Sequence, residues 1–353
     1  MKILITGAAG FAGSGIARFF KENSSGVTLY GMDNLSRRGS EFNLPLLKKL
    51  DCKFFHGDVR NKEDTDDLPQ ADWIIDCAAN PSVLAGLDGG SLGLVNNNLT
   101  GTINLLEKCR KDHTGFVMLS TSRVYSINEL IKVPLAETGD RFEVDEKGVF
   151  PAGFSSLGVT ENFSTAAPIS LYGSTKLASE ILALEYHYTF GFPVRINRCG
   201  VIAGPGQFGK IDQGIFSFWI YNWIMNKPLS YIGFHGTGHQ VRDLFSPDDL
   251  GALLVSQLND PARKAPLIIN AGGGLQSSMS LKELNHFCRE HFGFEKEIQV
   301  NKTDRPFDIP YYVTDNTAAG KYWNWQPAQS KERLLNDILV WGLENKSLIE
   351  SGF

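Results

Sequence analysis

The chain has few of the residues that build disulfide frameworks, metal sites or hydrolytic triads. Its five cysteines are scattered, odd in number and never spaced as C-x-x-C, which disfavours both a disulfide framework and a zinc site. We expect reduced thiols packed as small hydrophobic groups. The seven histidines show no metal-ligand spacing, and no Ser-His-Asp arrangement can be assembled. We therefore predict no metal site.

Long runs of one charge and long apolar runs are also missing. The formal net charge is −5 and both signs are mixed along the chain, which argues against nucleic acid or a membrane surface as a partner. Nothing approaches the length of a transmembrane helix. Residues 1–7 pass from a short apolar run straight into a glycine loop, which is unlike a signal peptide. We expect a cytoplasmic protein.

Apolar segments alternate with helical patterns in the first part of the chain. Strands are expected at 3–5, 27–32, 53–57, 73–77, 116–119 and 194–198, with a helix near 11–23. Continuously apolar strands separated by helices indicate an α/β fold with a parallel sheet covered on both faces. Ligands of such a sheet bind beyond the carboxyl ends of its strands.

The later part of the chain is less regular. Residues 126–168 are too long for an ordinary connection, so we interpret them as a functional insertion or flap. After about residue 205, an aromatic helix at 216–223 and further short elements indicate a smaller lobe, while 266–270 is expected to return to the sheet. The predicted main domain is 1–204 with parts of the later chain such as 235–275, and the predicted smaller lobe is 205–234 with 276–353.

Three glycines follow the first expected strand with G-x-x-G-x-x-G spacing, at Gly7, Gly10 and Gly13. Glycine lets the backbone turn tightly and approach a pyrophosphate, which then rests on a helix N-terminus. The motif alone is weak, and an ordinary glycine turn is the alternative. Its place between a strand and a helix predicts a dinucleotide site in the main domain.

Acidic residues after the second and third strands indicate which dinucleotide is bound. Asp33 follows Gly13 by twenty residues, where a carboxylate accepts hydrogen bonds from the adenosine ribose and repels a 2′-phosphate. This favours NAD over NADP, although Arg37 and Arg38 could host a phosphate. Asp58 is expected beside the adenine, or else as the cap of a helix that begins near residue 61.

The pair Tyr172 and Lys176 predicts the chemistry. Four residues apart on a helix, a phenol and an ammonium share one face, and the cation would lower the tyrosine pKa. We predict that Tyr172 takes a proton from an alcohol while hydride leaves for nicotinamide. Thr121, at the end of the fifth strand, could bond the reacting oxygen or be a solvated turn hydroxyl, and Ser120 or Ser122 could share its role.

Three other side chains are candidates with alternatives. Asn98 lies in a helix expected behind the cofactor, where its amide could bond the backbone near the catalytic strand or simply start the helix. Arg242 and Arg305 could clamp a diphosphate, because arginine suits bidentate phosphate contact, or could be surface ion pairs. The aromatic stripe at 216–223 is interpreted as core or as a dimer contact.

Together these residues resemble the extended short-chain dehydrogenase/reductase family, the NAD-dependent nucleotide-sugar epimerases and dehydratases, over nearly the whole chain. The matching motifs are the glycine loop, Asp33-Asn34, Gly57-Asp58-Val59, Ala78-Ala79, Asn98 with Gly101-Thr102, Thr121 with Val124-Tyr125, Tyr172 with Lys176, Arg198 with Gly204-Pro205, Val241-Arg242-Asp243, and Arg305 with Asp308. The resemblance implies a Rossmann-type doubly wound parallel sheet with a smaller mixed C-terminal substrate lobe. It also implies a catalytic triad of Tyr172, Lys176 and Thr121.

The resemblance further implies the ligand contacts and the assembly. NAD would be bound by Gly7, Gly10, Phe11, Ala12, Gly13, Asp33, Asn34, Ser36, Arg37, Asp58, Val59, Ala78, Ala79, Asn98, Tyr172, Lys176 and Arg198. A nucleotide-diphosphate sugar would be bound by Ser122, Gln207, Gln213, Arg242, Arg305 and Asp308, with Arg242 and Arg305 on the diphosphate. A homo-dimer or homo-tetramer is implied.

Within the family the chain looks most like the CDP-paratose 2-epimerases, also called CDP-tyvelose 2-epimerases. Residues 33–39, 56–61, 207–214 and 236–243 carry this likeness, and so does the long gap between Thr121 and Tyr172. It implies C2 epimerisation of a CDP-hexose through a keto sugar, as an isomerase of lipopolysaccharide biosynthesis.

The alternatives are a UDP-sugar 4-epimerase, a nucleotide-sugar reductase or dehydrogenase, and a non-catalytic NAD-sensing regulator. Ser122 and Arg123 follow Thr121 where related 4,6-dehydratases carry an Asp-Glu pair. Positions 122–124 also lack the cysteine of related enzymes that abstract a proton beside a ketone. Hydride removal and return is therefore the predicted reaction.

Overall fold

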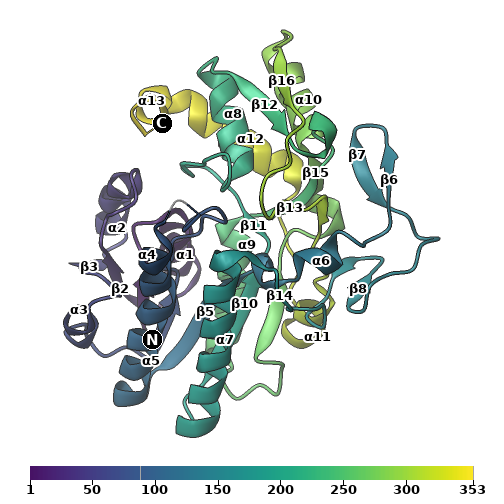
Figure 1. The fold of residues 1–353 in the computed structure, drawn as a ribbon. Coiled ribbons are helices and arrows are strands. Elements are labelled where there is room, and N and C mark those ends of the chain that lie inside the picture. The colour runs from purple at the N-terminus through teal and green to yellow at the C-terminus, as the bar shows by residue number, and fades with distance from the viewer. Residues whose placement is uncertain (88, 353) are drawn as a thin grey trace.

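A seven-stranded parallel sheet forms the body of the protein (Figure 1). The computed structural model describes residues 1–87 and 89–352. The sheet order is β14-β10-β5-β4-β1-β2-β3, with β1 (Lys2–Thr6), β2 (Thr28–Asp33), β3 (Lys53–His56), β4 (Trp73–Asp76), β5 (Gly115–Thr121), β10 (Val194–Cys199) and β14 (Ile268–Ala271). Each predicted strand is present with its ends shifted by at most two residues, the usual uncertainty of strand boundaries.

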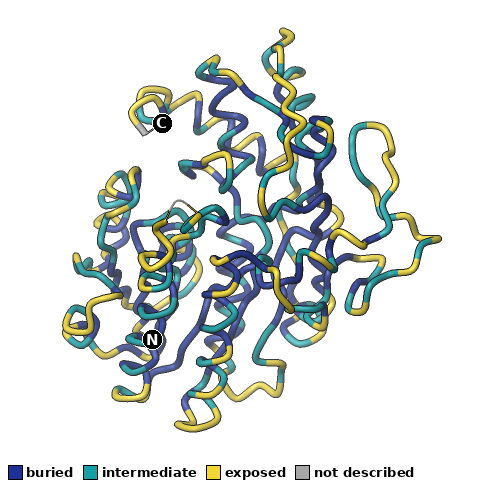
Figure 2. Tube along the Cα trace, viewed as in Figure 1, coloured by how far each residue is buried: buried dark blue, intermediate teal, exposed yellow. Residues whose placement is uncertain are grey.

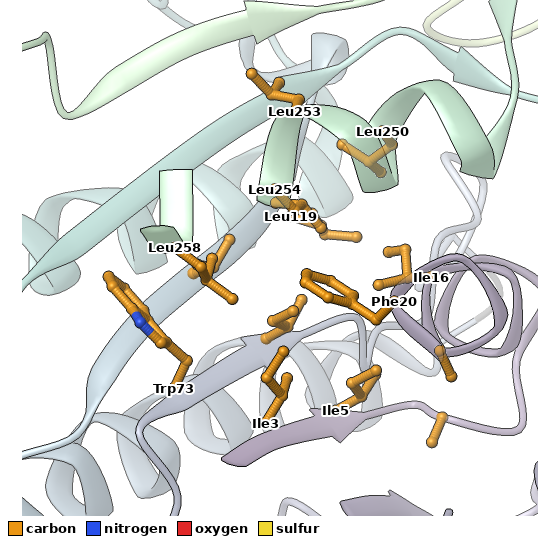
Figure 3. Packing of buried hydrophobic residues seen from close by; sticks show 14 of the residues in the cluster. Ile3, Ile5, Ile16, Phe20, Trp73, Leu119, Leu250, Leu253, Leu254 and Leu258 are labelled. Carbon is orange, nitrogen blue, oxygen red and sulfur yellow. The ribbon is translucent and has the colours of Figure 1, made fainter. Parts of the chain in front are cut away.

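Helices cover both faces of this sheet because its strands are apolar on both sides. One face carries α1 (Phe11–Asn23), α2 (Leu44–Lys49), α9 (Pro247–Asn259) and α11 (Thr317–Trp323). The other carries α5 (Gly101–Asp112) and α7 (Ser170–Phe190), with α3 (Lys62–Asp66) beside α5. Ile3 and Ile5 of β1 pack toward α1 and α9 (Figure 3), whereas Leu4 packs on the opposite face. This alternation follows the two-residue period of a strand.

The winding of the sheet reverses between β1 and β4. β2 and β3 follow β1 on one side, and β4, β5, β10 and β14 extend the sheet on the other. The loops that leave β1 and β4 therefore diverge to opposite faces and open a crevice at their carboxyl ends. This is the place where the sequence predicts a ligand site.

A smaller lobe lies beyond these carboxyl ends, as Figure 1 shows. Its four-stranded sheet consists of β11 (Val201–Ile202), β13 (Val241–Phe245), β15 (Ser278–Ser280) and β17 (Tyr311–Tyr312), and β12 (Leu229–Ile232) pairs with β16 (Ile298–Asn301). Its helices are α8 (Ile215–Ile224), α10 (Leu281–Phe292), α12 (Lys331–Glu344) and α13 (Lys346–Gly352). Four aromatic residues of α8 are buried together, Phe216, Trp219, Tyr221 and Trp223, so the core interpretation of the aromatic stripe is confirmed.

The insertion at 126–168 contains α6 (Ile127–Leu130) and two small hairpins. These are β6 (Leu135–Thr138) with β7 (Arg141–Val144), and β8 (Phe154–Ser155) with β9 (Gly158–Val159). The insertion shares a hydrophobic cluster with residues 309–313. The β6–β7 hairpin projects away from the body and is largely exposed (Figure 2).

Short helical turns complete the described chain: α4 (Ser91–Val95), the π-helical η2 (Asn96–Thr100), and the 3-10 turns η1 (Ser40–Asn43), η3 (Ser122–Val124), η4 (Phe234–Gly236) and η5 (Leu275–Ser277). All five cysteines are free and four of them are buried, as predicted for reduced thiols. No helix in the described part of the chain is long and apolar enough to span a membrane.

Candidate active site

A cavity of about 1000 Å³ lies at the carboxyl ends of β1, β2, β4, β5 and β10, between the sheet and the smaller lobe. Its lining runs from the glycine loop to Arg242 and Arg305. Residues 126–168 do not line it and pack against residues 309–313 of the smaller lobe. The flap interpretation is therefore wrong, and a functional insertion stays a prediction. No group of His, Cys, Asp or Glu within residues 1–87 and 89–352 is arranged to hold a metal ion.

The glycine loop has the geometry that a pyrophosphate requires. Gly7 has φ +64°, and a Cβ there would lie 2.8 Å from the Cys77 carbonyl oxygen. A Cβ at Gly13 would lie 2.2 Å from the Gly7 carbonyl oxygen. α1 begins directly after Gly10, without a side-chain cap on its first N–H groups. The backbone can therefore approach a phosphate closely and offer it free donors.

Asp33 ties the end of β2 to this loop. Its carboxylate accepts hydrogen bonds from the N–H groups of Ala9 (3.1 Å) and Leu35 (2.8 Å), and it lines the cavity. Burial raises its pKa against the effect of these bonds. Arg37 donates to the Phe208 carbonyl (3.3 Å) and to the side chain of Gln213, so its guanidinium already has partners from the smaller lobe.

Asp58 does not cap the helix that follows it. Asn61 caps α3 by accepting from a backbone N–H. The Asp58 carboxylate instead accepts from the Asn34 amide (2.9 Å) and from Arg60, whose hydrogen bond is the main cause that lowers the Asp58 pKa to about 2. Val59 lines the cavity and Asp58 does not. The adenine contact of Asp58 stays a prediction.

Tyr172 and Thr121 are brought together in the cavity as the sequence predicts. Both side chains are buried, and the threonine hydroxyl is close enough to oppose the rise in the phenol's pKa that burial causes. The Thr121 hydroxyl also accepts from the backbone N–H of Arg123 (3.1 Å). A hydroxyl that accepts one bond still has its own proton to donate. Ser122 lines the cavity beside them.

The predicted effect of Lys176 on the tyrosine pKa is wrong. Burial raises the pKa of Tyr172 to about 12, and the groups that oppose this are Thr121 and the charge of Arg123. The buried Lys176 ammonium acts instead on the thiols of Cys77 and Cys199, whose pKa values burial raises. The spacing fixes the shared helix face but not the direction of the lysine side chain, whose charge acts on Cys77 after β4 and Cys199 at the end of β10.

Asn98 does not line the cavity but holds Asn80, which does. Its side chain accepts from the Asn80 N–H (2.8 Å), and it donates to the Asn80 carbonyl (3.2 Å) and the Thr175 hydroxyl (3.1 Å). It lies in the π-helical turn η2, a distortion that is frequent at functional sites. Asn98 thus joins the loop after β4 to α7, which supports the functional interpretation over a helix start.

Arg198 is not a cavity residue. Its guanidinium forms a buried ion pair with Glu180 (2.7 Å) and also donates to the Tyr125 hydroxyl (3.3 Å) and the Glu161 carbonyl (3.3 Å). The predicted cofactor contact of Arg198 is therefore replaced by a structural contact. Glu180 follows Tyr172 by eight residues on the buried face of α7, where a carboxylate needs a partner.

Arg242 and Arg305 meet at Asp308. Arg242 donates to the Asp308 carboxylate (3.2 Å) and the Ile309 carbonyl (2.7 Å), and Arg305 donates to the same carboxylate (2.9 Å). Burial, together with neighbouring arginine charges, lowers the pKa of Arg242 to about 9. Burial would raise the Asp308 pKa, but the arginines outweigh it and lower that pKa. The cluster is positive and faces the cavity.

The remaining predicted contacts line the same cavity: Phe11, Ala12, Asn34, Ser36, Ala78, Ala79, Gln207 and Gln213. Sequence reasoning missed Arg123, Ser82 and Asp212 among the lining residues. The Ser82 hydroxyl is hydrogen-bonded to the Asp212 carboxylate across the cavity. Arg123 could have been found, because it directly follows Ser122 at the end of β5.

Known proteins resemble the chain over its whole length. The CDP-paratose 2-epimerase of Salmonella typhi is 29% identical over 352 residues, which are 97% of this chain and 99% of the relative. The UDP-glucuronate 4-epimerase of Thermodesulfobacterium geofontis is 28% identical over 360 residues, 99% and 98% of the two chains. The crystal structure of UDP-glucuronic acid 4-epimerase from Bacillus cereus, in complex with UDP-glucuronic acid and NAD, superimposes with a TM-score of 0.79 at 25% identity and covers 100% of both chains.

A family model also matches most of the chain. A sequence model of the NAD dependent epimerase/dehydratase family matches residues 3–272. That match includes the glycine loop, Thr121, Tyr172 and Arg242. The chain therefore belongs to the NAD dependent epimerase/dehydratase family and is an enzyme whose cofactor is NAD.

Proposed function

We propose that this enzyme inverts one hydroxyl-bearing carbon of a nucleotide-diphosphate sugar by removing and returning hydride. The observation that carries the proposal is one continuous cavity. The glycine loop, the neighbouring side chains of Tyr172 and Thr121, and the arginines Arg242 and Arg305 all line it. NAD bound on the glycine loop supplies the hydride acceptor, and the residues of the chain move the proton and hold the sugar.

Tyr172 is the proposed acid–base group. As phenolate it takes the hydroxyl proton while hydride leaves the same carbon, which becomes a carbonyl. In the return step the phenol gives the proton back while hydride adds to the opposite face of the same carbon, which becomes an alcohol again. Thr121 stabilises the phenolate by donating its hydroxyl proton, and the arginine pair holds the diphosphate while the sugar ring turns over.

Epimerisation is favoured over dehydration. Members of the same family include dTDP-glucose 4,6-dehydratases, which must expel a hydroxyl with an acid and a base. The positions after Thr121 are Ser122 and Arg123, and neither side chain can serve as the carboxylate pair that the resemblance associates with that step. Hydride transfer needs no further acid–base group beyond Tyr172.

For the substrate we propose a CDP-hexose that is epimerised at C2. The full-length similarity to a CDP-paratose 2-epimerase supports this choice. A UDP-sugar 4-epimerase is the second candidate, supported by the UDP-glucuronate 4-epimerase relative and the Bacillus cereus structure. The oligomeric state, the cytoplasmic location and a role in lipopolysaccharide biosynthesis stay predictions.

The test is turnover of a panel of CDP- and UDP-sugars by the NAD-loaded enzyme in deuterium oxide. We expect an epimer of unchanged mass with no deuterium on carbon, identified by NMR and mass spectrometry. The Tyr172→Phe variant should keep NAD but lose on the order of a hundredfold or more in turnover. Carbon-bound deuterium or loss of water would contradict the hydride mechanism, and near-normal turnover by Tyr172→Phe would remove the phenol from it.

A further inference from the structure

Arg123 is a cation in the cavity that has no carboxylate partner. Arg242 and Arg305 each form an ion pair with Asp308. Arg123 lines the same cavity and donates only to the Phe307 carbonyl (3.2 Å), and no acidic side chain in the described chain lies within ion-pair distance of it. The Asp308 carboxylate acts on Arg123 from a distance but is already paired with Arg242 and Arg305. A partly desolvated guanidinium without an ion pair of its own is costly, so a bound anion would be stabilised there.

Arg123 lies between Tyr172 and the pair Arg242 and Arg305. A Cβ on Gly173, the neighbour of Tyr172, would lie 2.2 Å from the Arg123 carbonyl oxygen, so α7 touches the Arg123 backbone. Phe307, whose carbonyl Arg123 binds, packs in the hydrophobic cluster that contains Tyr172. The next residue along is Asp308, where Arg242 and Arg305 converge.

We propose that Arg123 contacts the substrate at two points, the diphosphate and the oxygen on the reacting carbon, and thereby selects the hydroxyl next to the anomeric carbon. This inference rests on the proposed function and assigns its regiochemistry. Arg123 moves no proton, because a guanidinium keeps its protons in proteins. The hydroxyl proton still goes to Tyr172.

The chemistry of the pyranose ring supports this choice of carbon. The diphosphate is attached through the oxygen on C1, and the C2 oxygen is its neighbour on the ring. The C4 oxygen lies across the ring from the diphosphate. A guanidinium presents five N–H donors in a fixed planar fork, so one arginine can reach a phosphate oxygen and the C2 oxygen together but not a phosphate and the C4 oxygen.

A second consequence concerns the reaction itself. When the C2 hydroxyl loses its proton and hydride, the new carbonyl oxygen is electron-rich, and a donor already aimed at it lowers the barrier. The charge of Arg123 also favours the phenolate form of Tyr172. Removing the charge should therefore shift the pH dependence of turnover, whereas a purely structural residue would not.

The experiment compares Arg123→Lys, which keeps the positive charge but loses the planar set of guanidinium donors, with Arg123→Met, which loses both. Arg333→Met, on the exposed side of α12, is the matched control because the one ion pair that it forms with the described residues is a long one at 4.0 Å. CDP and CDP-glucose are titrated into each NAD-loaded protein, and product stereochemistry is followed with the sugar that the wild-type enzyme converts. NAD content and circular dichroism establish that each variant is folded.

We expect wild-type enzyme to invert C2, and Arg123→Met to lose roughly tenfold or more in affinity for CDP-glucose, with a smaller loss for CDP. The rising limb of its kcat profile should move to higher pH, and Arg123→Lys should restore the limb but not the full affinity. Arg333→Met should match the wild type.

Three results would overturn the inference while leaving the proposed hydride-based epimerisation intact. The first is inversion at C4 alone. The second is an equal loss of affinity for CDP and for CDP-glucose in Arg123→Met, with an unchanged pH profile. The third is Arg123→Met kinetics equal to those of the wild type. A wild-type enzyme that inverts no sugar carbon refutes the proposed function, and the role of Arg123 falls with it.

Discussion

Replacing Gly173 by alanine should damage the active site far more than it damages the fold. Gly173 is buried in α7 between Tyr172 and the face that packs on Arg123. An alanine Cβ would lie 2.2 Å from the Arg123 carbonyl oxygen and 3.1 Å from its carbonyl carbon. Ordinary contact begins near 3.4 Å, so helix and turn must separate by about an ångström. Both neighbours are backbone, and neither can rotate away.

The magnitude follows from two opposing effects. Alanine is the better helix former by about 1 kcal/mol in a helix interior, while overpacking a close backbone contact costs typically about 1–3 kcal/mol. The net loss of stability is thus on the order of 1 kcal/mol, a few degrees of Tm at most. The separation, however, moves Tyr172 away from Thr121, and a displacement of about 1 Å at a reacting group can cost roughly a hundredfold in rate.

The assay pairs thermal unfolding with kcat for the NAD-loaded enzyme. Gly93→Ala is the control for stability, because nothing lies within 4 Å of a Cβ at Gly93 in α4 and the change should be neutral or slightly stabilising. A Gly173→Ala enzyme with wild-type kcat would refute the reasoning, since it would mean that α7 and the turn at Arg123 can part without disturbing the catalytic pair. A large loss of Tm with intact kcat would refute it equally.

Further predictions rest on single contacts. Arg242→Ala and Arg305→Ala should each weaken nucleotide-diphosphate binding by roughly tenfold to a hundredfold in titration while bound NAD stays unchanged, since one charge-assisted bond is worth about 1.5–3 kcal/mol. Asn98→Leu should cost about 1–3 kcal/mol in chemical denaturation, because it removes the hydrogen bonds to the Asn80 backbone and the buried bond to the Thr175 hydroxyl; a neutral result would mean that water replaces the amide. Turnover should rise with pH across about pH 6 to 9, because Tyr172 must lose a proton and its folded pKa of about 12 lies above that range; a falling profile would contradict a tyrosine base. NAD rather than NADP should be released when the purified protein is denatured, since Asp33 would repel a 2′-phosphate, and mainly NADP would contradict this.

The strand positions and the glycine loop could be predicted because their signals are local. A strand buried on both faces, such as Trp73–Asp76, must be apolar at nearly every position. Gly7 and Gly13 are required by contacts within their own loop and the adjacent strand end. Tyr172 and Thr121 could be expected in one cavity because parallel strand ends and the following helix converge on one edge of the sheet.

The partners of the charged side chains could not be predicted in the same way. Arg198 and Glu180 belong to different elements, and only the packing of α7 on β10 brings them together. The spacing of Tyr172 and Lys176 gives a shared helix face but not the direction in which a long, flexible lysine extends. Such pairings depend on side-chain rotamers and on the distances between elements. The periodicity of the sequence predicts neither of these.

Contacts between the two lobes agree with a cycle in which the same hydride leaves and returns. The loop after β2 reaches the smaller lobe through Arg37, which binds Phe208 and Gln213. The loop after β4 reaches it through Ser82 and Asp212. All five residues line the cavity, so side chains beside the cofactor cradle and side chains beside the substrate end hold each other in place. A dehydrogenase must release its reduced cofactor at every turnover, and these hydrogen bonds between the lobes would have to break each time. An epimerase regenerates NAD within the site, so it can keep these hydrogen bonds intact while the cofactor stays bound.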